Sequence, residues 1–410
     1  MGNSVDIEVE PGDVGFDAAR LARIDKHFAR YVDDGRLAGW QVVVSRHGKR
    51  VHSSTYGMRD REAGLPVEAD TLWRIYSMTK PITTVLAMQL FEEGAFALTD
   101  EVSRYLPAFA DMRIYRSGTA DKPTTVPATE PIRMWHLMSH TAGLTYGFTK
   151  FNAVDEMYRL AGSDFGQPSE LDLAGLCDLW AGLPLMFEPG TSWNYSVATD
   201  VLGRVCEVLT GQSLDVAFRE RILEPLGMTD TDWWAQDANR LAALYAPMPG
   251  TGEAFRYDVI GNGALHPPHW LGGGGGLIST AHDYDRFTRM LLGGGELDGT
   301  RILGSRTLRY MAQNHLPGGA LLTSMARGQF AETAYDGMGF GLGFGVLVDP
   351  VAYKVPASAG EFTWGGAAST AFWVDPVEQI TAAFYTQLLP SSTYPIRTEL
   401  RSLVYTSLID

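Results

Sequence analysis

Cysteine is scarce in this chain, in which Cys177 and Cys206 are the only two among 410 residues. Neither belongs to a C-x-x-C pair, and both lie in stretches with helical spacing. The pattern favours two buried free thiols in a reducing cytoplasm over a disulfide.

Positive charge is also in short supply. The chain has 33 Lys and Arg against 48 Asp and Glu, a formal net charge of −15, and no cluster of basic residues relieves it. Such a surface is a poor partner for nucleic acid or an anionic membrane. We expect a small-molecule substrate instead, and the sequence gives no indication of the oligomeric state.

Long apolar runs and a leader-like N-terminus are missing too. The stretch from Met1 to Pro11 is acidic and lacks a basic region followed by an apolar core, which argues against a signal peptide. No apolar run approaches the length needed to span a bilayer. We therefore expect no membrane anchorage and a cytoplasmic location.

The remaining composition, 45% hydrophobic and 20% charged, is ordinary for a globular enzyme, and the length suggests two domains. We expect a sheet domain built from both chain ends, residues 1–76 with 227–410, and a mainly helical domain, 77–226, inserted between them. Periodicity predicts these elements: a helix over Asp17–Asp33, a hairpin of Gln41–Ser45 with Arg50–Tyr56, a surface loop over Arg116–Pro131, strands over Phe340–Val348, Glu361–Trp373 and Ile380–Gln387, and a last helix over Tyr394–Leu408.

The most informative stretch is Ser77-Met78-Thr79-Lys80-Pro81, at the start of a helix that the spacing of apolar residues carries to Glu93. Pro81 is tolerated in a first turn, where its missing N–H has no partner to lose. Ser77 and Lys80 then share one face and can touch. A desolvated lysine can take the proton of a serine nucleophile, although an N-cap serine beside a solvated lysine explains the tetrad equally well.

Two further stretches offer groups for chemistry or binding. Tyr195 lies at the start of a predicted helix over Val197–Thr210, where a phenol can relay a proton if an ammonium stabilises its anion. His136 and His140 have metal-ligand spacing, but no third ligand is evident, and a structural turn is the favoured interpretation. We expect neither a metal nor an organic cofactor.

Glycine marks two close approaches of the backbone. The run Gly272–Gly276 has no following lysine and is not a phosphate loop, so we expect it to pass close to the nucleophile or its substrate. Within Trp364-Gly365-Gly366-Ala367, the N–H of Ala367 can pair with that of Ser77 as an oxyanion hole. A simple bulge is the alternative for the glycine pair.

Taken together, these stretches resemble the serine β-lactamase and penicillin-binding-protein superfamily. The likeness is greatest to class C β-lactamases and to the carboxylesterases of the same fold called family VIII esterases, and it covers nearly the whole chain. It implies an α/β (α+β) fold of the β-lactamase/transpeptidase type, with an antiparallel sheet flanked by helices and a helical domain. By the resemblance, Ser77 is the nucleophile, and Lys80 and Tyr195 share the role of general base.

Two departures from the family pattern bear on the substrate. The second motif reads Tyr195-Ser196-Val197 without the usual asparagine, and the third has Trp364 where lysine is common. Without that cation a β-lactam carboxylate loses its partner, so we expect a carboxylesterase acting on short-chain esters of a small or aromatic alcohol. Substrate contacts are predicted at the following residues: Trp364, Gly365, Gly366, Trp193, Trp270 and Phe148. For Trp193, Trp270 and Phe148, simple packing is the alternative.

The resemblance leaves other functions open. A β-lactamase, a D-amino-acid peptidase or an acyltransferase could use the same acyl-enzyme on Ser77. A catalytically silent binding protein on this fold is a separate possibility, against which the joint presence of Ser77, Lys80 and Tyr195 argues.

Overall fold

The computed structural model describes residues 5–165, 170–328 and 332–409. Its centre is an eight-stranded sheet in the order β12-β13-β14-β15-β16-β1-β2-β3, in which every neighbouring pair is antiparallel. The strands span these residues: Met338–Phe340, Gly345–Leu347, Phe362–Gly365, Ala371–Asp375, Ile380–Tyr385, Gly39–Arg46, Lys49–Asp60 and Leu65–Pro66.

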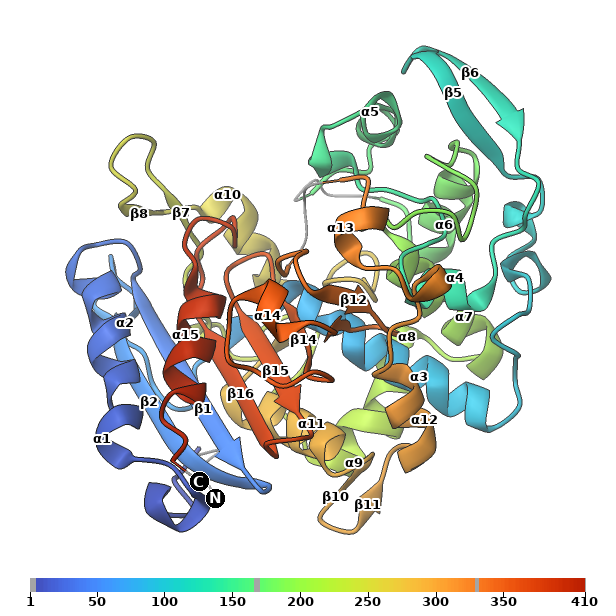
Figure 1. Ribbon diagram of the computed structural model, residues 1–410. Coiled ribbons are helices and arrows are strands. Elements are labelled where there is room, and N and C mark those ends of the chain that lie inside the picture. The colour runs from blue at the N-terminus through green and yellow to red at the C-terminus, as the bar shows by residue number, and fades with distance from the viewer. Residues whose placement is uncertain (1–4, 166–169, 329–331, 410) are drawn as a thin grey trace.

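The sheet joins the two ends of the chain. β16 pairs with β1 over the register Gln41↔Tyr385 to Arg46↔Ile380, and the termini lie close together (Figure 1). This confirms the prediction of an antiparallel sheet built from both ends, whereas the division into two domains remains a prediction.

The first hairpin follows from its sequence. All eight residues of β1 are buried, as expected of a central strand, and β2 returns beside it. The two turn residues, His47 and Gly48, both have positive φ, at 53° and 73°. Two left-handed residues match the twist of a tight hairpin, so the predicted hairpin is confirmed.

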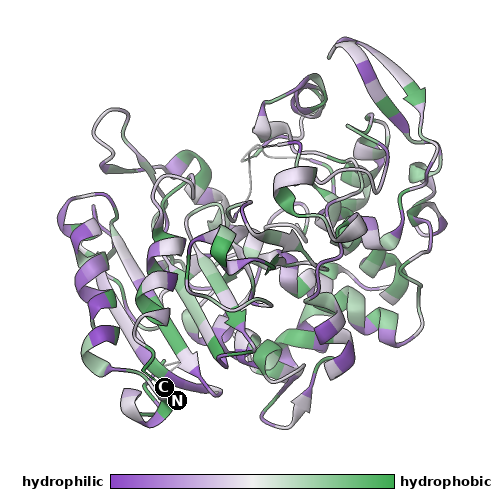
Figure 2. Cartoon of the chain, in the orientation of Figure 1, coloured by the Kyte–Doolittle hydropathy of each residue, from purple (hydrophilic) through white to green (hydrophobic). Residues whose placement is uncertain are grey.

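Helices cover both faces of the sheet (Figure 1). Phe384 of β16 contacts Phe28 of helix α2, whereas the next residue, Tyr385, stacks on Trp73 on the opposite face, where α11 packs against β15 and β16. Alternate strand residues point to opposite faces, so both faces are buried. Figure 2 shows the apolar residues concentrated in the strands and the polar ones on the outer side of α2.

The helices have the following bounds: α1 Ala18–Leu21, α2 Arg23–Asp33, α3 Thr79–Glu92, α4 Met134–Met138, α5 Ala153–Leu160, α6 Leu173–Ala181, α7 Ala198–Thr210, α8 Leu214–Phe218, α9 Glu224–Leu226, α10 Asp258–Gly261, α11 Ala281–Leu292, α12 Ser305–Met311, α13 Leu322–Met325, α14 Pro350–Tyr353 and α15 Ile396–Tyr405. Helices α3 to α8 gather beside the sheet, with α3 packed against α7 (Figure 1). None of the helices in the described ranges has both the length and the apolar character that a membrane crossing requires.

Four short two-stranded sheets complete the fold: β5 Arg113–Thr119 with β6 Lys122–Pro127, β4 Trp73–Arg74 with β9 Ile278–Ser279, β7 Tyr245–Pro247 with β8 Ala254–Arg256, and β10 Glu296–Leu297 with β11 Thr300–Arg301. The pair β4–β9 matters most for function. It places the residues before Ser77 beside the end of the glycine run.

Three sequence-based predictions were wrong in detail. The stretch predicted as a loop over Arg116–Pro131 forms most of the exposed β5–β6 hairpin. The prediction failed because its Gly, Thr and Pro residues are typical of loops and gave no sign of strand pairing. The single strand predicted over Phe340–Val348 is the hairpin β12–β13, reversed near Gly343 at a φ of 87°. The strand predicted over Glu361–Trp373 is likewise two strands, β14 and β15, with a tight turn that includes Ser369 at a φ of 70°.

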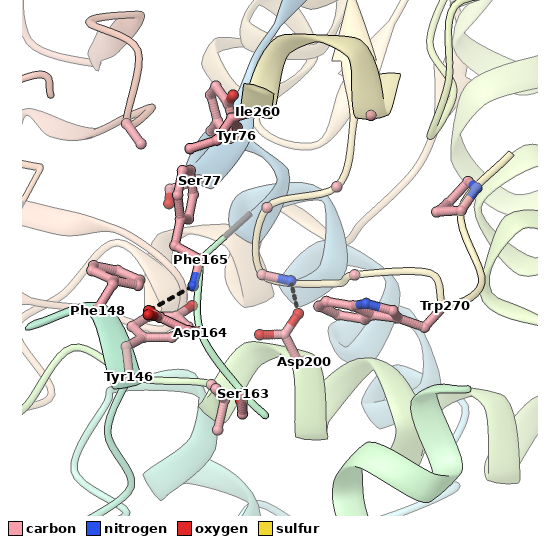
Figure 3. Close-up of a pocket in the computed structure, with 18 of the residues that line it drawn as sticks. Tyr76, Ser77, Tyr146, Phe148, Ser163, Asp164, Phe165, Asp200, Ile260 and Trp270 are labelled. Atoms are coloured by element: carbon pink, nitrogen blue, oxygen red, sulfur yellow. Dashed lines mark hydrogen bonds between the residues drawn. The ribbon is translucent and has the colours of Figure 1, made fainter. Parts of the chain in front are cut away.

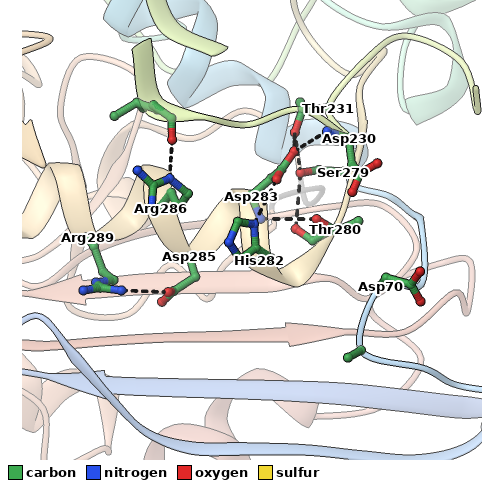
Figure 4. Close-up of polar contacts among 12 residues, drawn as sticks. Asp70, Asp230, Thr231, Ser279, Thr280, His282, Asp283, Asp285, Arg286 and Arg289 are labelled. Atoms are coloured by element: carbon green, nitrogen blue, oxygen red, sulfur yellow. Dashed lines mark hydrogen bonds and ion pairs between the residues drawn. The ribbon is translucent and has the colours of Figure 1, made fainter. Parts of the chain in front are cut away.

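A buried carboxylate fixes α11 to the segment that contains Asp230 and Thr231 (Figure 4). Asp283 accepts hydrogen bonds from the Asp230 N–H at 2.7 Å and from the Thr231 hydroxyl at 2.9 Å, and Thr231 also contacts Ser279. Since a buried carboxylate is costly without such donors, this cluster holds the two segments in one arrangement.

Candidate active site

Ser77 and Lys80 lie together at the start of α3. Ser77 belongs to a single 3₁₀ turn, Tyr76–Met78, and α3 begins at Thr79, so Pro81 falls in its first turn as predicted. The Lys80 Nζ donates to the Ser77 Oγ at 3.3 Å and to the Tyr146 hydroxyl at 3.1 Å, and it also donates to the carbonyl of Gly274. Three oxygen atoms, one of them the Ser77 Oγ itself, therefore hold the Lys80 amine beside Ser77.

Burial prepares Lys80 to act as a base. Its side chain is 1% exposed, and this loss of hydration lowers its pKa to about 8, against the opposing effect of the Asp200 and Glu332 charges. An ammonium in a dry site favours its neutral form, which is the form that accepts a proton. The alternative of a solvated lysine beside a capping serine does not fit this geometry.

Tyr195 faces the same two residues. The Lys80 Nζ lies 4.4 Å from the centre of the Tyr195 ring, and the Trp364 indole N–H donates to the Tyr195 hydroxyl at 3.3 Å. Burial raises the pKa of Tyr195 well above its ordinary value, and the Glu332 charge adds to this, whereas hydrogen bonds with Ser77 and Trp364 oppose it. The Tyr195 phenol thus keeps its proton near neutral pH. Of these two residues, Lys80 is the one that titrates there.

Three polar residues of the site were missed by sequence reasoning: Tyr146, Asp200 and Glu332. Burial raises the pKa of Tyr146 well above its ordinary value, so it holds Lys80 as a neutral phenol. The Glu332 side chain is fully buried in an ion pair with Arg397. No local pattern marks these residues, although Asp200 follows Tyr195 by little more than one helical turn.

Asp200 is linked to Lys80 through the backbone of one glycine. The Asp200 Oδ1 accepts the N–H of Gly274 at 2.7 Å (Figure 3), and the carbonyl of the same glycine accepts from Lys80. Burial raises the pKa of Asp200 to about 6, partly offset by the Lys80 charge. A Cβ on Gly274 would collide with the Asp200 carboxylate, which explains one member of the glycine run.

The glycine run passes close to the nucleophile, in agreement with the sequence-based expectation. A Cβ on Gly275 would lie 4.0 Å from the Ser77 nitrogen. Ala367 lines the same pocket as Ser77, as an oxyanion hole made by their two N–H groups requires.

The structure places the remaining predicted substrate contacts outside the pocket lining. Trp364 of the third motif and Trp193, two residues before Tyr195, are 1% and 0% exposed and do not line the pocket; Trp193 stacks on Tyr195, with ring centres 6.3 Å apart. Gly365 and Gly366 do not line it either. A Cβ on Gly365 would collide with the Arg397 guanidinium, and one on Gly366 with the Ile75 carbonyl, so these glycines make room for protein atoms and not for substrate.

The pocket beside Ser77 has a volume of about 330 Å³. Phe148 and Trp270, both predicted as substrate contacts, do line it, and they lie on opposite sides of Asp200 (Figure 3). Its remaining walls are largely aromatic and apolar, with contributions from Tyr76, Tyr146, Phe165, Leu176, Trp180, Val197, Trp233 and Ile260.

The two histidines with metal-ligand spacing have structural roles. The His136 Nδ1 accepts the Arg133 N–H at 2.9 Å, and burial lowers the pKa of His136 to about 4. His140 follows the end of α4 with a φ of 56° and contacts Ser196. In the part of the chain that the structure describes, no three His, Cys, Asp or Glu side chains gather as metal ligands would.

Comparison with known proteins places this geometry in a family. A family model described as Beta-lactamase matches residues 24–405. The chain belongs to the beta-lactamase family. The family assignment confirms both the resemblance and the fold class expected from the sequence.

Several relatives match this beta-lactamase family member over most of both chains. Protein Rv1367c of Mycobacterium tuberculosis (strain ATCC 25618 / H37Rv) is 36% identical over 362 residues, which cover 87% of this chain and 88% of that protein. Esterase EstB of Burkholderia gladioli is 32% identical over 422 residues, covering 97% and 98%. The solved structure of EstCE1, described as a hydrolase with promiscuous acyltransferase activity, has a TM-score of 0.79 and 30% identity, covering 94% and 99%.

Proposed function

We propose that this protein is a serine carboxylesterase that hydrolyses small neutral esters through an acyl-enzyme on Ser77. The observation that carries the proposal is the contact of the Ser77 Oγ with a buried Lys80 whose pKa lies near 8. The similarity to Esterase EstB over nearly the whole chain supports the reaction class.

In the proposed mechanism the neutral Lys80 takes the proton of the Ser77 hydroxyl as its oxygen attacks the ester carbonyl. The N–H groups of Ser77 and Ala367 stabilise the oxyanion. Tyr195, in contact with both Ser77 and Lys80, passes the proton to the departing alcohol, and the carbonyl forms again as the acyl-enzyme. Water then attacks the acyl carbon as the neutral Lys80 takes its proton, and return of that proton to the Ser77 oxygen as the acyl bond breaks frees the acid and restores Ser77.

The surroundings of the third motif favour esters over β-lactams. The Trp364 indole N–H donates a hydrogen bond to the Tyr195 hydroxyl. No cation extends from that motif into the pocket. The nearby Arg397 is paired with Glu332 and also donates to the carbonyls of Gly366 and Thr370. A substrate carboxylate would therefore be desolvated without a free cationic partner.

Acyl transfer is a second candidate, favoured by the similarity to EstCE1, whose description includes a promiscuous acyltransferase activity. An alcohol would replace water in the second step and leave as a new ester. Product analysis with added methanol distinguishes the two reactions, since transfer predicts a methyl ester at the expense of the free acid.

The test is hydrolysis of p-nitrophenyl butyrate by wild type, Ser77→Ala and the control Ser324→Ala, an exposed serine on α13. We expect Ser77→Ala to lose at least about a thousandfold in kcat/KM and Ser324→Ala to match wild type. Nitrocefin in a parallel well measures β-lactam turnover. Equal activity of Ser77→Ala and wild type would place the nucleophile elsewhere, and inertness of every variant toward esters would favour a binding protein.

We also place the enzyme in the cytoplasm, a reducing compartment that suits the buried free thiols Cys177 and Cys206. Recovery of the esterase activity from the cytoplasmic fraction of its source cells checks this location, and recovery from the periplasm or medium would contradict it.

A further inference from the structure

One wall of the pocket beside the nucleophile is a row of aromatic rings. The centres of the Tyr76 and Phe165 rings are 5.7 Å apart, Phe165 meets Phe148 edge to face at 5.6 Å, and Phe148 stacks on Tyr146 at 4.8 Å. All four residues line the pocket, and three separate chain segments provide them. We call Tyr76, Phe148 and Phe165 the ring wall.

The backbone of Tyr76 contributes to this arrangement. Its φ is 43°, a left-handed conformation that is unfavourable for a bulky residue. Tyr76 directly precedes Ser77, and Gly275 lies next to its peptide: a Cβ on that glycine would lie 3.7 Å from the Tyr76 carbonyl carbon, an ordinary contact distance. Strained conformations of this kind are retained where the surroundings enforce them, which is often at a functional site.

Trp270 lies across the pocket from the ring wall, on the other side of Asp200 (Figure 3). Its indole meets Trp180 edge to face, with ring centres 6.4 Å apart, so its orientation is fixed by another ring of the pocket. A group that enters the pocket near Ser77 therefore meets aromatic surface from two directions.

The positive charge of Arg74, which lies beside these rings, does not change the aromatic and apolar character of the pocket. Arg74 lines the pocket, but its guanidinium donates to the carbonyls of Ala242 and Gly261 and to the side chain of Gln387. Through these hydrogen bonds the Arg74 guanidinium stabilises the fold. The surface that remains for a substrate group is mostly aromatic and apolar.

We propose that the pocket binds an aromatic ring of the ester substrate between the ring wall and Trp270. This inference rests on the proposed esterase function and names the class of its substrate: aryl or arylalkyl esters, preferred over aliphatic esters of equal bulk. Aromatic pairs gain interaction energy beyond the area they bury, and here this corresponds to about a two- to tenfold preference in kcat/KM.

The test compares two matched pairs of esters by titration of the released acid. Benzyl acetate is paired with cyclohexylmethyl acetate, and ethyl phenylacetate with ethyl cyclohexylacetate, so that the ring lies on the alcohol side or on the acyl side. We expect wild type to prefer the aromatic member at least about twofold in one of the pairs. p-Nitrophenyl acetate reports in parallel whether the esterase itself is active.

Two variants link the preference to the ring wall. Phe165→Leu keeps an apolar side chain but removes the ring, and we expect the aryl-to-cyclohexyl ratio to fall toward one. The control is Phe151→Leu, a 54% exposed phenylalanine outside the pocket lining, and we expect it to keep the wild-type ratio.

The outcomes distinguish failure of the proposed aryl site from failure of the proposed esterase function. A wild-type ratio near one in both pairs, with p-nitrophenyl acetate hydrolysed, overturns the aryl site and leaves the esterase in place. A wild-type preference that Phe165→Leu fully retains overturns the ring wall as its cause. If no ester is hydrolysed at all, the proposed function fails and the aryl site with it; if Phe165→Leu does not fold, the wild-type ratios still decide.

Discussion

Removing the charge of Asp200 should move the pH at which the enzyme becomes active. Asp200 is 3% exposed, and its negative charge raises the pKa of Lys80 against the effect of burial. Asp200→Asn removes that charge but keeps an oxygen that can accept the N–H of Gly274. The glycine run therefore stays in place while the Lys80 pKa falls.

The size of the effect follows from the titration of Lys80. With a pKa of about 8, about one Lys80 in ten is neutral at pH 7, against about one in three thousand for an ordinary lysine. Loss of one nearby opposite charge lowers the pKa by about one unit, so that about half of the lysines are neutral at pH 7. The acid limb of kcat/KM should then shift down by about one pH unit, with about a fivefold gain at pH 7.

The sign and range of the shift are specific. Above about pH 9 Lys80 is largely neutral in both enzymes, so the gain disappears there. Asp200 has a pKa of about 6 and is itself mostly protonated below that pH, so the two profiles should converge again. The gain is thus confined to a window between about pH 6 and pH 9.

The assay is kcat/KM for p-nitrophenyl butyrate from pH 5.5 to 9.5, with background hydrolysis subtracted. Glu207→Gln, on the same helix but outside the pocket lining, is the matched control and should keep the wild-type profile. An acid limb of Asp200→Asn that stays in place or moves to higher pH would refute the coupling between Asp200 and Lys80.

Two further predictions test the supports of the site. Gly365→Ala should displace the Arg397 guanidinium from the carbonyls of Gly366 and Thr370 and so disturb Ala367, lowering kcat about 10- to 100-fold with little change in KM; an unchanged kcat would show that the oxyanion hole does not depend on this contact. Asp283→Ala should remove the acceptor of two hydrogen bonds in the buried cluster and lower the free energy of unfolding in urea by about 2–4 kcal/mol, whereas Asp298→Asn, which removes the charge from an exposed ion pair with Arg286 at a position with a φ of 50°, should cost under about 1 kcal/mol; equal losses would contradict the difference in burial.

The parts of the fold that the sequence predicted well are those in which local patterns decide the structure. The buried run of β1 and its Gly48 turn define a hairpin, and the apolar spacing after Ser77, with a proline in the first turn, defines α3. The β5–β6 hairpin was missed because its residues are mostly exposed, so no buried face produces the alternation that marks a strand. Strand limits near Gly343 and Ser369 depend on backbone turns that composition alone does not reveal.

The proposed catalytic residues followed from motifs, but their environment did not. Tyr146 binds Lys80, and the charges of Asp200 and Glu332 act on it, from three segments that are distant from Ser77 in the chain and that no spacing rule connects. Trp193 was predicted as a substrate contact, with simple packing as the alternative. It packs behind Tyr195 instead, since an indole next to a buried phenol gains more from stacking than from exposure to a pocket.

The third motif shows how the protein uses groups that sequence reasoning assigned to the substrate. The Trp364 indole N–H binds the Tyr195 hydroxyl, and the two glycines after it leave space for the Arg397 guanidinium and the Ile75 carbonyl. Arg397 is in turn neutralised by Glu332. The Arg397 guanidinium is therefore bound to protein atoms beside Ala367. Under the proposed function, selection of the substrate then depends on the shape and the aromatic surface of the pocket.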